Sequence, residues 1–284
     1  MDLMESIKDY WSVQPPYKGE GEVGTREWSD SILRHRYEVI PYCKDLLCLD
    51  TVRNRKVFEI GCGSGSDALE LCRAGAFVTS VDITQTAVDL TRKRLELEGH
   101  KANINTYSGR DLSQYPSNSY DVVHSGGVVH HTPYTDDLLA EAHRILKPGG
   151  VLRFMVYNKD SFLYWYSIVY LRQIQQHGGK ISRDEALSRY SEFRTGCPYT
   201  RAFTADEMKD KLSYFSSVTT STAYDVYDTL EDRKVKTPAQ SLQFRKAWKS
   251  GVADVDNFIA KYYRMFESYN EKKHGWHLIT EAVK

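Results

Sequence analysis

The stretch VFEIGCGSGSD (residues 57–67) joins an apolar run, an acidic residue and three glycines at alternate positions. The apolar run predicts a buried β-strand over Val57–Ile60, and the run ALELCRAG (68–75) that follows predicts a helix. Glycine has no Cβ, so this loop lets the backbone turn sharply and come close to a ligand. Free N–H groups and the dipole at the start of the helix favour a negatively charged ligand group. The stretch therefore predicts a strand, a ligand-binding loop and a helix.

The spacing of the glycines separates two classes of cofactor. A dinucleotide-binding fingerprint reads G-x-G-x-x-G, whereas here the third glycine comes one residue early and Ser66 occupies the sixth position. The pattern E-x-G-x-G-x-G, at Glu59, Gly61, Gly63 and Gly65, resembles motif I of the class I S-adenosylmethionine-dependent methyltransferases. In that family the loop surrounds the methionine and ribose parts of the cofactor. The alternative is an ordinary glycine-rich turn between a strand and a helix.

A second predicted strand, residues 77–83, ends in an acidic residue, Asp82. A carboxylate at the end of the strand beside a glycine-rich loop can accept hydrogen bonds from both ribose hydroxyls, as in other doubly wound nucleotide-binding folds. The alternative is a helix N-cap, because Asp and Thr are favoured caps and a helical run follows at 85–99. Thr84 fits the cap better, which leaves Asp82 free for the ribose, with Ile83 beside it.

The third strand-like run, residues 103–109, leads into Arg110, Asp111 and Leu112. In the family that the chain resembles, an acidic residue here pairs with the exocyclic amine of adenine, and Asp111 matches that position. The alternative is an exposed loop aspartate. An aromatic residue near a sulfonium gains cation–π attraction, so Tyr10 and Trp11 are expected to close over the cofactor. The expected cofactor contacts are Glu59, Gly61, Cys62, Gly63, Gly65, Asp82, Ile83, Arg110, Asp111, Leu112, Ser125, Tyr10 and Trp11.

Further elements follow in the order of the fourth and fifth strand units of these methyltransferases. Residues 120–124 read as a buried strand that opens into the small-residue loop 125–127. A helical pattern covers 136–146, the run KPGG (147–150) signals a stop and a turn, and a strand follows at 151–157. This succession makes the resemblance specific.

The resemblance covers residues 55–157 well and the remainder weakly. It implies an α/β fold, with a Rossmann-like, seven-stranded, mostly parallel sheet and helices on both faces. The last two strands are expected at 216–227 and 276–284, as an antiparallel edge beside the fifth strand.

Two insertions into this minimal fold are predicted to form a helical lid. One holds the aromatic helix FLYWYSIVYLRQIQQ (162–176), and the other holds at least one amphipathic helix within 239–269. Ligands of open α/β sheets bind at the carboxyl ends of the strands, where the insertions leave the sheet. The expected division is an N-terminal helical and loop cap (1–50), the cofactor-binding core (51–157), the first insertion (158–202), the core continued (203–227), the second insertion (228–274) and the final strand (275–284).

His130 and His131, just past the fourth strand, are the candidate catalytic residues. Methyl transfer from a sulfonium is an in-line displacement, so it needs an oriented acceptor in a dry site. A hydroxyl or a protonated amine also needs a base, and a neutral imidazole suits that task near pH 7. His130 is the first choice for the base and His131 the second. The alternative is that the pair belongs to the loop and lines the pocket.

The candidate substrate-binding residues are two arginines beside aromatics, two residues at the end of the fifth strand and one aromatic residue of the first insertion. Guanidinium groups hold carboxylates through two hydrogen bonds, although a surface or ion-paired role is the alternative for each arginine. A string typical of amino-group methylation, QPPY (14–17), lies before the glycine loop, but the loop HSGGVV already follows the fourth strand, which argues against a permuted enzyme. The expected substrate contacts are Arg26, Tyr157, Asn158, Tyr199 and Arg201.

Composition bounds the possible partners. The chain has 284 residues, with 38 basic and 38 acidic side chains, and this neutral balance argues against a nucleic-acid substrate. The five cysteines form no CxxC pair, which fits a reducing cytosol, and no carboxylate cluster predicts a metal. No signal peptide or apolar run of about 20 residues is found, so a cytoplasmic protein without a membrane span is expected.

The resemblance thus implies an S-adenosylmethionine-dependent methyltransferase. The aromatic insertions favour an enclosed pocket, and hence a small-molecule acceptor methylated on oxygen or nitrogen, either aromatic or bearing a carboxylate. Three alternatives stay open: a macromolecular acceptor (a protein side chain or RNA), a non-catalytic partner protein that binds the cofactor, and transfer of another group such as aminopropyl. The sequence leaves the oligomeric state and the identity of the acceptor open.

Overall fold

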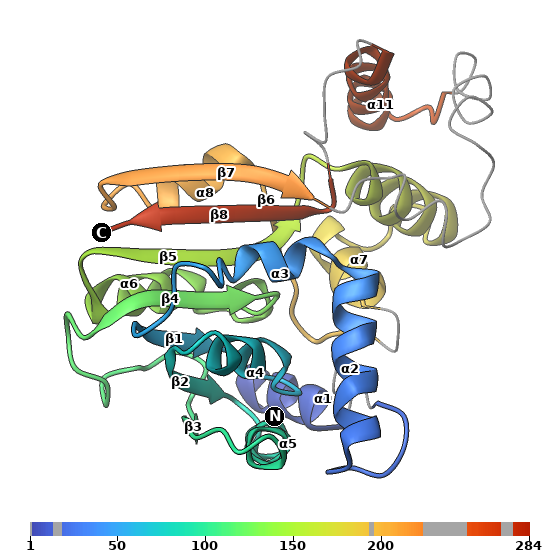
Figure 1. Ribbon diagram of the computed structural model, residues 1–284. Coiled ribbons are helices and arrows are strands. Elements are labelled where there is room, and N and C mark those ends of the chain that lie inside the picture. Colours follow the sequence, from blue (N-terminus) through green and yellow to red (C-terminus); the bar gives the residue numbers. More distant parts are fainter. Residues whose placement is uncertain (1, 14–18, 193–195, 224–248, 268–274) are drawn as a thin grey trace. The chain divides into compact units, whose positions relative to one another are not determined.

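The computed structural model describes residues 2–13, 19–192, 196–223, 249–267 and 275–284 (Figure 1). The chain divides into two compact units, which are described separately. Unit 1 comprises Met1–Met155, Lys209–Thr219 and Thr280–Lys284, and unit 2 comprises Val156–Met208 and Thr220–Ile279.

One mixed sheet organises the fold. Its strands lie in the order β3-β2-β1-β4-β5-β8-β7, and β6 pairs with β5 outside this path. The pairs β1–β2, β2–β3, β1–β4 and β4–β5 are parallel, so the strand order reverses between β1 and β4. The strands are β1 (Lys56–Ile60), β2 (Phe77–Asp82), β3 (Asn103–Thr106), β4 (Tyr120–Gly126), β5 (Leu146–Asn158), β6 (Ala202–Phe203), β7 (Ser217–Ala223) and β8 (His277–Val283).

The predicted Rossmann-like sheet is confirmed, with two differences of detail. The two-residue strand β6 adds an eighth strand to the expected seven. The strand expected at 216–227 is β7 (Ser217–Ala223), and residues 224–227 lie outside the described residues.

The expected antiparallel edge is also present. Lys284 donates its N–H to the carbonyl of Gly150 and accepts from the N–H of Gly149, both at 3.0 Å, so β8 runs against β5. On the other side, the N–H of Ser216 donates to the carbonyl of Val283 at 2.8 Å, so β7 also runs against β8.

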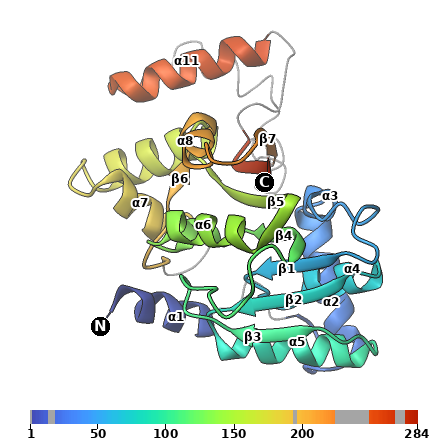
Figure 2. The ribbon, with the colours of Figure 1, turned by 90° about the vertical axis from the view of Figure 1, so that its left-hand side faces the viewer.

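Helices cover both faces of the parallel strands (Figure 2), as right-handed crossovers between parallel strands require. The structure contains α1 (Leu3–Val13), α2 (Arg26–Val39), α3 (Tyr42–Leu46), α4 (Ser66–Arg73), α5 (Gln85–Leu97), α6 (Thr135–Ile145), α7 (Arg183–Tyr190), α8 (Ala205–Lys211) and α11 (Ala253–Glu267), with a 3₁₀ turn η1 (Val129–His131) and a π-helix η2 (Leu163–Gln176). In the described residues, no helix has the length and hydrophobicity to cross a bilayer.

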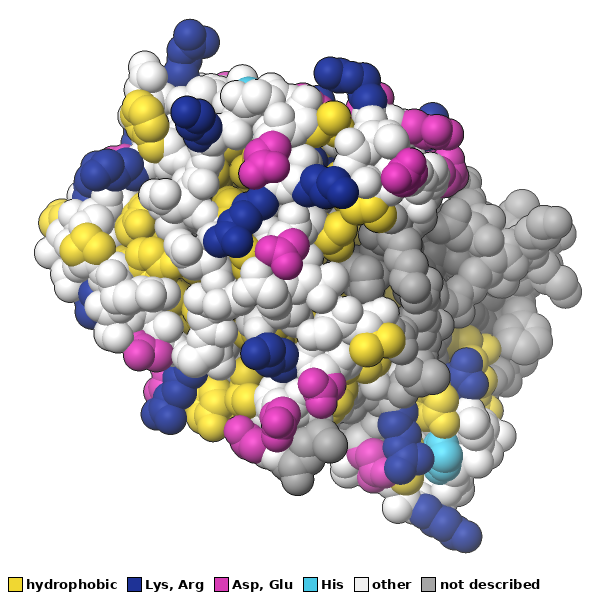
Figure 3. All heavy atoms as spheres, turned by 90° about the horizontal axis from the view of Figure 1, so that it is seen from below, with side chains coloured by type: hydrophobic (Ala, Val, Ile, Leu, Met, Phe, Trp, Pro, Cys, Tyr) yellow, Lys and Arg dark blue, Asp and Glu magenta, His cyan; other side chains and the backbone are white. Residues whose placement is uncertain are grey.

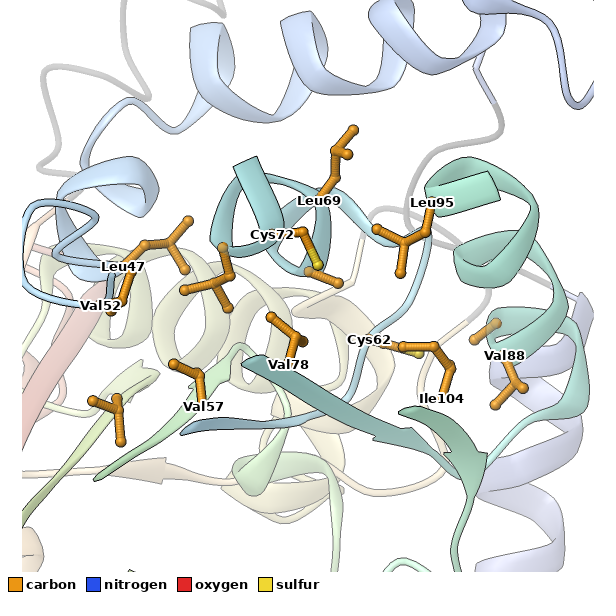
Figure 4. Packing of buried hydrophobic residues seen from close by; sticks show 14 residues of the cluster. Leu47, Val52, Val57, Cys62, Leu69, Cys72, Val78, Val88, Leu95 and Ile104 are labelled. Carbon is orange, nitrogen blue, oxygen red and sulfur yellow. The ribbon is translucent and has the colours of Figure 1, made fainter. Parts of the chain in front are cut away.

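The core beside the glycine loop lies between α4, α5 and one face of the strands (Figure 4). Val57, Val78 and Ile104 come from three neighbouring strands and are almost fully buried. Leu69 of α4 and Leu95 of α5 close the cluster from above. This packing fixes the ends of β1 and β2, from which the site is built.

Two local elements differ from a simple reading of the sequence. Helix α2 starts at Arg26, because Thr25 caps it through its hydroxyl, and the helical run is broken at Ile40–Pro41. The KPGG run forms an irregularity within β5 and not a turn before it. Tyr120 pairs with Leu146 and Val122 pairs with Val151, so the extra residues of β5 between these two pairs bulge out of the strand. The glycine in this bulge, Gly149, has a φ of +74°.

The aromatic helix of the first insertion is wound as a π-helix over Leu163–Gln176. At its end the N–H of His177 donates to the carbonyl of Arg172, five residues earlier, at 3.2 Å. Within unit 2, its Trp165 stacks on Phe258 of α11 with ring centroids 5.7 Å apart. Most of the second insertion lies outside the described residues.

Candidate cofactor and active site

The loop after β1 is held against the neighbouring strand. The N–H groups of Gly61 and Cys62 both donate to the carbonyl of Val81 on β2, at 2.7 and 3.1 Å. Gly61, Gly63 and Gly65 have φ values of +85°, +52° and +79°, a conformation that side chains with a Cβ rarely adopt. The predicted strand–loop–helix is therefore present, with α4 starting at Ser66.

The three glycines differ in what surrounds them. A Cβ on Gly61 would lie 2.2 Å from Val128, and one on Gly65 would lie 2.9 Å from the backbone of Thr91, so these two are required by packing. A Cβ on Gly63 would have no described atom within 4 Å. Gly63 is thus the position at which the loop borders open space among the described residues, and a ligand contact there stays a prediction.

Asp82 ends β2 beside this opening, and it is almost fully buried. Its Oδ2 accepts a hydrogen bond from the N–H of Gly63 at 3.0 Å, and its Oδ1 accepts from the N–H and the hydroxyl of Thr84 at 2.9 and 3.0 Å. Burial raises the pKa of Asp82, although these hydrogen bonds oppose the shift.

The prediction for Thr84 is confirmed, because its hydroxyl accepts from the N–H of Ala87 and caps α5. Asp82 is not the cap, and its carboxylate accepts hydrogen bonds from the glycine loop and from Thr84. Each carboxylate oxygen can accept two hydrogen bonds, so capacity for a ribose hydroxyl remains on Oδ2. The ribose role itself stays a prediction.

Glu59 lies on β1, two residues before Gly61, and only 2% of its surface is exposed. The hydroxyl of Ser80 donates to its Oε2 at 2.5 Å. Burial, together with the negative charge of Asp67, raises the pKa of Glu59 to about 8. Glu59 is therefore buried within the sheet, and its direct contact with the cofactor stays a prediction.

A buried ionic network that the sequence did not predict connects α2, α4 and β4. Asp67 accepts hydrogen bonds from Arg36 (Nε, 2.7 Å, and Nη2, 2.5 Å) and from the Tyr37 hydroxyl (3.0 Å). His124 Nε2 lies 3.2 Å from Asp67 Oδ2. Burial works to raise the pKa of Asp67, but Arg36 and His124 hold it below its usual range. The network links the first turn of α4 to α2 and to β4.

On the expected adenine side, two of the predicted residues are exposed and already paired, and the third is buried. Asp111 is exposed and its carboxylate accepts from the N–H and the hydroxyl of Ser113, at 2.7 and 2.9 Å. Arg110 forms an ion pair with Asp137 at 2.7 Å, and Leu112 is fully buried. The geometry of Asp111 is that of the exposed loop aspartate, and its contact with adenine stays a prediction.

Helix α1 covers the ends of these loops. A Cβ on Gly109 would lie 2.4 Å from the Met4 side chain and 3.2 Å from Ile83, so Met4 packs onto the loop next to Ile83. The hydroxyl of Thr132 donates to the carbonyl of Gly109 at 3.3 Å. Ser125, fully buried, donates its hydroxyl to the carbonyl of Ile60 at 3.0 Å and so fastens β4 to β1.

The histidine pair follows β4 in η1, and both imidazoles are buried, with 0% of His130 and 5% of His131 exposed. Their ring centroids lie 4.1 Å apart. Trp11 of α1 meets His131 edge-on at 5.1 Å, and Tyr10 meets Trp11 edge-on at 5.0 Å. The structure thus brings together the predicted aromatic cover and the predicted catalytic pair.

Four of the expected substrate residues lie in unit 2. Tyr157 stacks on Trp276 at 4.4 Å and donates its hydroxyl to Glu192 at 2.5 Å. Asn158 is buried, and its amide donates to the carbonyl of Gly275 at 2.9 Å. Asn158 therefore joins two backbone segments, whereas an open side chain facing the acceptor was expected.

The two arginines differ in setting. Arg201 lies over the ring of Tyr199 at 4.2 Å and 3.6 Å from Asp184, which fits the ion-paired alternative, and its contact with a substrate stays a prediction. Arg26, in unit 1, is exposed at the first position of α2. Among the described residues, no group of three or more His, Cys, Asp or Glu side chains is arranged to hold a metal ion.

The strand order, the glycine loop at the switch point and the carboxylate at the end of β2 define a nucleoside-cofactor domain of the doubly wound class. Residues 58–154 match the family described as "Methyltransferase domain". The matched region is thus a methyltransferase domain, which implies S-adenosylmethionine as the cofactor.

Curated relatives share this domain at modest identity. A ubiquinone biosynthesis O-methyltransferase of Nitrosococcus oceani is 28% identical over 129 residues, which are 43% of this chain and 55% of the relative. Another, of Aromatoleum aromaticum, is 24% identical over 178 residues, or 60% of this chain and 76% of the relative. The chain thus spans about half the length of the first relative.

Solved structures extend the likeness in fold beyond the matched domain. An S-adenosylmethionine-dependent methyltransferase of Mesorhizobium loti has a TM-score of 0.53 at 14% identity, covering 86% of this chain and 97% of its own. The [4+2]-cyclase SpnF has a TM-score of 0.52 at 16% identity, covering 99% of this chain and 92% of its own. The fold is therefore shared by proteins that are named for different reactions.

Proposed function

We propose that the chain transfers a methyl group from S-adenosylmethionine to a hydroxyl oxygen of a small aromatic molecule. The observation that carries the proposal is the open position at Gly63 beside Asp82, in the same unit as the buried pair His130 and His131. The names of the curated relatives, which are O-methyltransferases, support oxygen as the acceptor atom.

The bound cofactor supplies a methyl group on a positively charged sulfur. The chain's own part is to orient the acceptor, exclude water and remove a proton. In this proposal His130, or His131 in its place, takes the hydroxyl proton while the oxygen forms its bond to the methyl carbon. The enclosure of both imidazoles and the cover of Trp11 over His131 support a water-poor site.

The acceptor-binding part of the proposal rests on the aromatic side chains of unit 2. Tyr157, stacked on Trp276, and Tyr199, stacked under Arg201, offer flat apolar faces with polar tips. Arg201 is already close to Asp184, so a carboxylate on the acceptor would compete with that ion pair. Arg26 and Asn158 remain proposed contacts. The cap (1–50) and the insertions (158–202 and 228–274) are proposed to cover the site.

The distribution of charge on one face of the molecule gives no support to a nucleic-acid acceptor. On the face drawn in Figure 3, Lys and Arg side chains are interspersed with Asp and Glu. A protein that binds nucleic acid gathers its Lys and Arg into a patch that neutralises phosphates.

The test combines methyl-labelled S-adenosylmethionine with catechols and phenolic acids, followed by mass spectrometry of the products. We expect a methyl ether from at least one compound. His130→Ala should lower turnover by about 10²–10⁴-fold if it is the base, with unchanged cofactor affinity, and His131→Ala is the matched comparison. Near-normal turnover of the His130→Ala variant would remove it from the mechanism. Absence of cofactor binding, with binding of a nicotinamide or flavin instead, would overturn the whole proposal.

A further inference from the structure

Three buried carboxyl groups lie around the glycine loop. Glu59 of β1, Asp67 of α4 and Asp82 of β2 are 2%, 5% and 9% exposed, and the negative charges of Asp67 and Asp82 both act on Glu59. Arg36 is the guanidinium that faces this group, and it is bound to Asp67 through two hydrogen bonds. The cluster therefore carries more acidic groups than its one permanent positive charge can balance.

The three carboxyl groups differ in how their negative charge is stabilised. Asp67 has Arg36, Tyr37 and His124 as partners, and Asp82 is held by donors from Gly63 and Thr84. Among the described residues, Glu59 has a single hydrogen-bond donor, the neutral hydroxyl of Ser80.

Glu59 is therefore the carboxyl group at which a proton is most easily kept. Burial and the neighbouring Asp67 raise the pKa of Glu59 to about 8, so the group is neutral at pH 7 in this structure. The charged and titratable groups that face it are Asp67 and Cys72 from α4, Arg36 from α2, Asp82 from β2, Cys62 from the loop and His124, its partner in register on β4.

We infer that Glu59 determines the preference of this domain for the positively charged cofactor over its thioether product, by giving up its proton when the sulfonium enters the loop. The inference rests on the proposed function, since it needs S-adenosylmethionine to bind in the loop that begins two residues after Glu59. It assigns to this buried side chain an electrostatic role in place of the direct contact that its position in the motif suggested.

S-adenosylmethionine carries a sulfonium, an ammonium and a carboxylate, whereas S-adenosylhomocysteine lacks the sulfonium charge. A positive charge brought close to a carboxyl group in a poorly solvated site lowers its pKa by about 1–3 units. Glu59 then becomes an anion that attracts the cofactor, and its proton passes to solvent. Once the methyl group has left the sulfur, the positive charge is gone, Glu59 takes a proton back and this attraction to the product ends.

The experiment is titration calorimetry of the full chain with S-adenosylmethionine and S-adenosylhomocysteine, in two buffers of different ionisation enthalpy. At pH 7 we expect the first ligand to release about one proton and the second clearly less. The ratio of the two affinities should rise by up to about tenfold per pH unit between pH 6 and 8.

Glu59→Gln keeps the size of the side chain and an acceptor for Ser80, but it cannot titrate. This variant should bind both ligands without proton release, with an affinity ratio that is flat with pH. Glu96→Gln, which changes an exposed glutamate on α5, should behave as the unmodified chain. Ser80→Ala removes the donor that favours ionised Glu59, so it should move the proton release to higher pH, which provides a second test if Glu59→Gln folds poorly.

The outcomes separate the two proposals. If neither nucleoside binds, the proposed function fails. If S-adenosylmethionine binds without proton release, or if the release persists unchanged in Glu59→Gln, the proposed function stands and the role of Glu59 is overturned.

Discussion

Arg36 of α2 and Asp67 of α4 form a two-point ion pair, with N–O distances of 2.7 and 2.5 Å, across 31 residues of sequence. Asp67 is buried at the first turn of the helix that follows the glycine loop. A carboxylate in that position is stabilised by the helix dipole, but burial makes it depend on its cation. The pair thus ties a helix of the N-terminal segment to the loop.

Removing Arg36 should be far more costly than removing an exposed arginine of the same helix. Arg36→Met leaves Asp67 as a buried anion without its cation, and we expect a loss of about 3–5 kcal/mol in the free energy of unfolding. Arg34→Met is the control, because Arg34 is exposed and 3.9 Å from Glu20, and such pairs contribute about 0–1 kcal/mol. Equal losses in urea unfolding would show that the Arg36 pair is not a structural link.

Asp82→Asn should weaken cofactor binding while the chain stays folded. The asparagine amide has the same shape as the aspartate carboxylate, but only one of its two polar atoms is an acceptor. It therefore cannot accept hydrogen bonds from both Gly63 and Thr84, and it has no charged oxygen to offer to a ribose hydroxyl. Hydrogen bonds to charged groups contribute about 1.5–3 kcal/mol, which corresponds to roughly 10–100-fold in affinity. Calorimetry with S-adenosylhomocysteine measures the effect, and Asp89→Asn on the exposed side of α5 is the control. Unchanged affinity would exclude the ribose assignment.

Gly63→Ala should separate the strain of a backbone conformation from the obstruction of a ligand. Gly63 and Gly99 both have positive φ, at +52° and +72°, and both have space for a Cβ among the described residues. Alanine at either position should therefore cost a similar 1–2 kcal/mol in stability. Only Gly63→Ala should also reduce the affinity for S-adenosylhomocysteine. If both variants bind it equally well, the open position at Gly63 is not the ligand site.

Glu59 should make the stability of the free chain depend on pH. Its pKa is raised from 4.5 to about 8 on folding, so the stabilisation by its proton is full below pH 4.5 and is lost as the pH rises through 8. Glu59→Gln lacks this loss, so the stability of the variant relative to the unmodified chain should increase from pH 5 to pH 9, by at most about 1.4 kcal/mol per pH unit. Urea unfolding without ligand measures it, with Glu96→Gln as the control. A difference that is flat with pH would contradict the shifted pKa.

Arg94 should tolerate replacement by an apolar side chain of similar length. It is fully buried on α5, its guanidinium lies 4.9 Å from the ring of Trp28, and its Nε and Nη2 have no hydrogen-bond partner among the described residues. Burial lowers the pKa of Arg94 to about 10. Because a buried cation without a carboxylate is poorly compensated, Arg94→Met should leave stability unchanged or raise it by about 1–2 kcal/mol.

Arg94→Ala is the matched comparison, since it removes the stem as well and should cost about 2–5 kcal/mol through the cavity. Equal losses in the two variants would show that the charge itself stabilises the fold.

The parts of the site that the sequence predicted are those encoded by neighbouring residues. Strand, glycine loop and helix follow from 57–67 alone, and the cap at Thr84 follows from the residues around it. Asp82 was located correctly at the end of β2, but its bonds to Gly63 and Thr84 depend on how the loop folds back. The sequence therefore located Asp82 but did not predict its hydrogen-bond partners.

The parts that were missed depend on contacts between distant segments. Asp67 is an ordinary acidic residue in the first turn of a helix, and Arg36 lies in a polar stretch of α2, so no local signal marks their pairing. The strand β6, with two residues, is too short to show alternation. The role of Asn158 in joining β5 to the residue before Trp276 likewise becomes visible only in the folded chain.

The anchoring of Gly61 and Cys62 to the carbonyl of Val81 has a consequence for the kinetics of recognition. The loop is ordered by the sheet before any nucleoside arrives, so little conformational entropy remains to be lost on association. The rate at which the nucleoside binds should therefore be limited by diffusion and by the opening of any segment that covers the loop. The amide hydrogens of these two residues should exchange with solvent as slowly as those of the strands themselves.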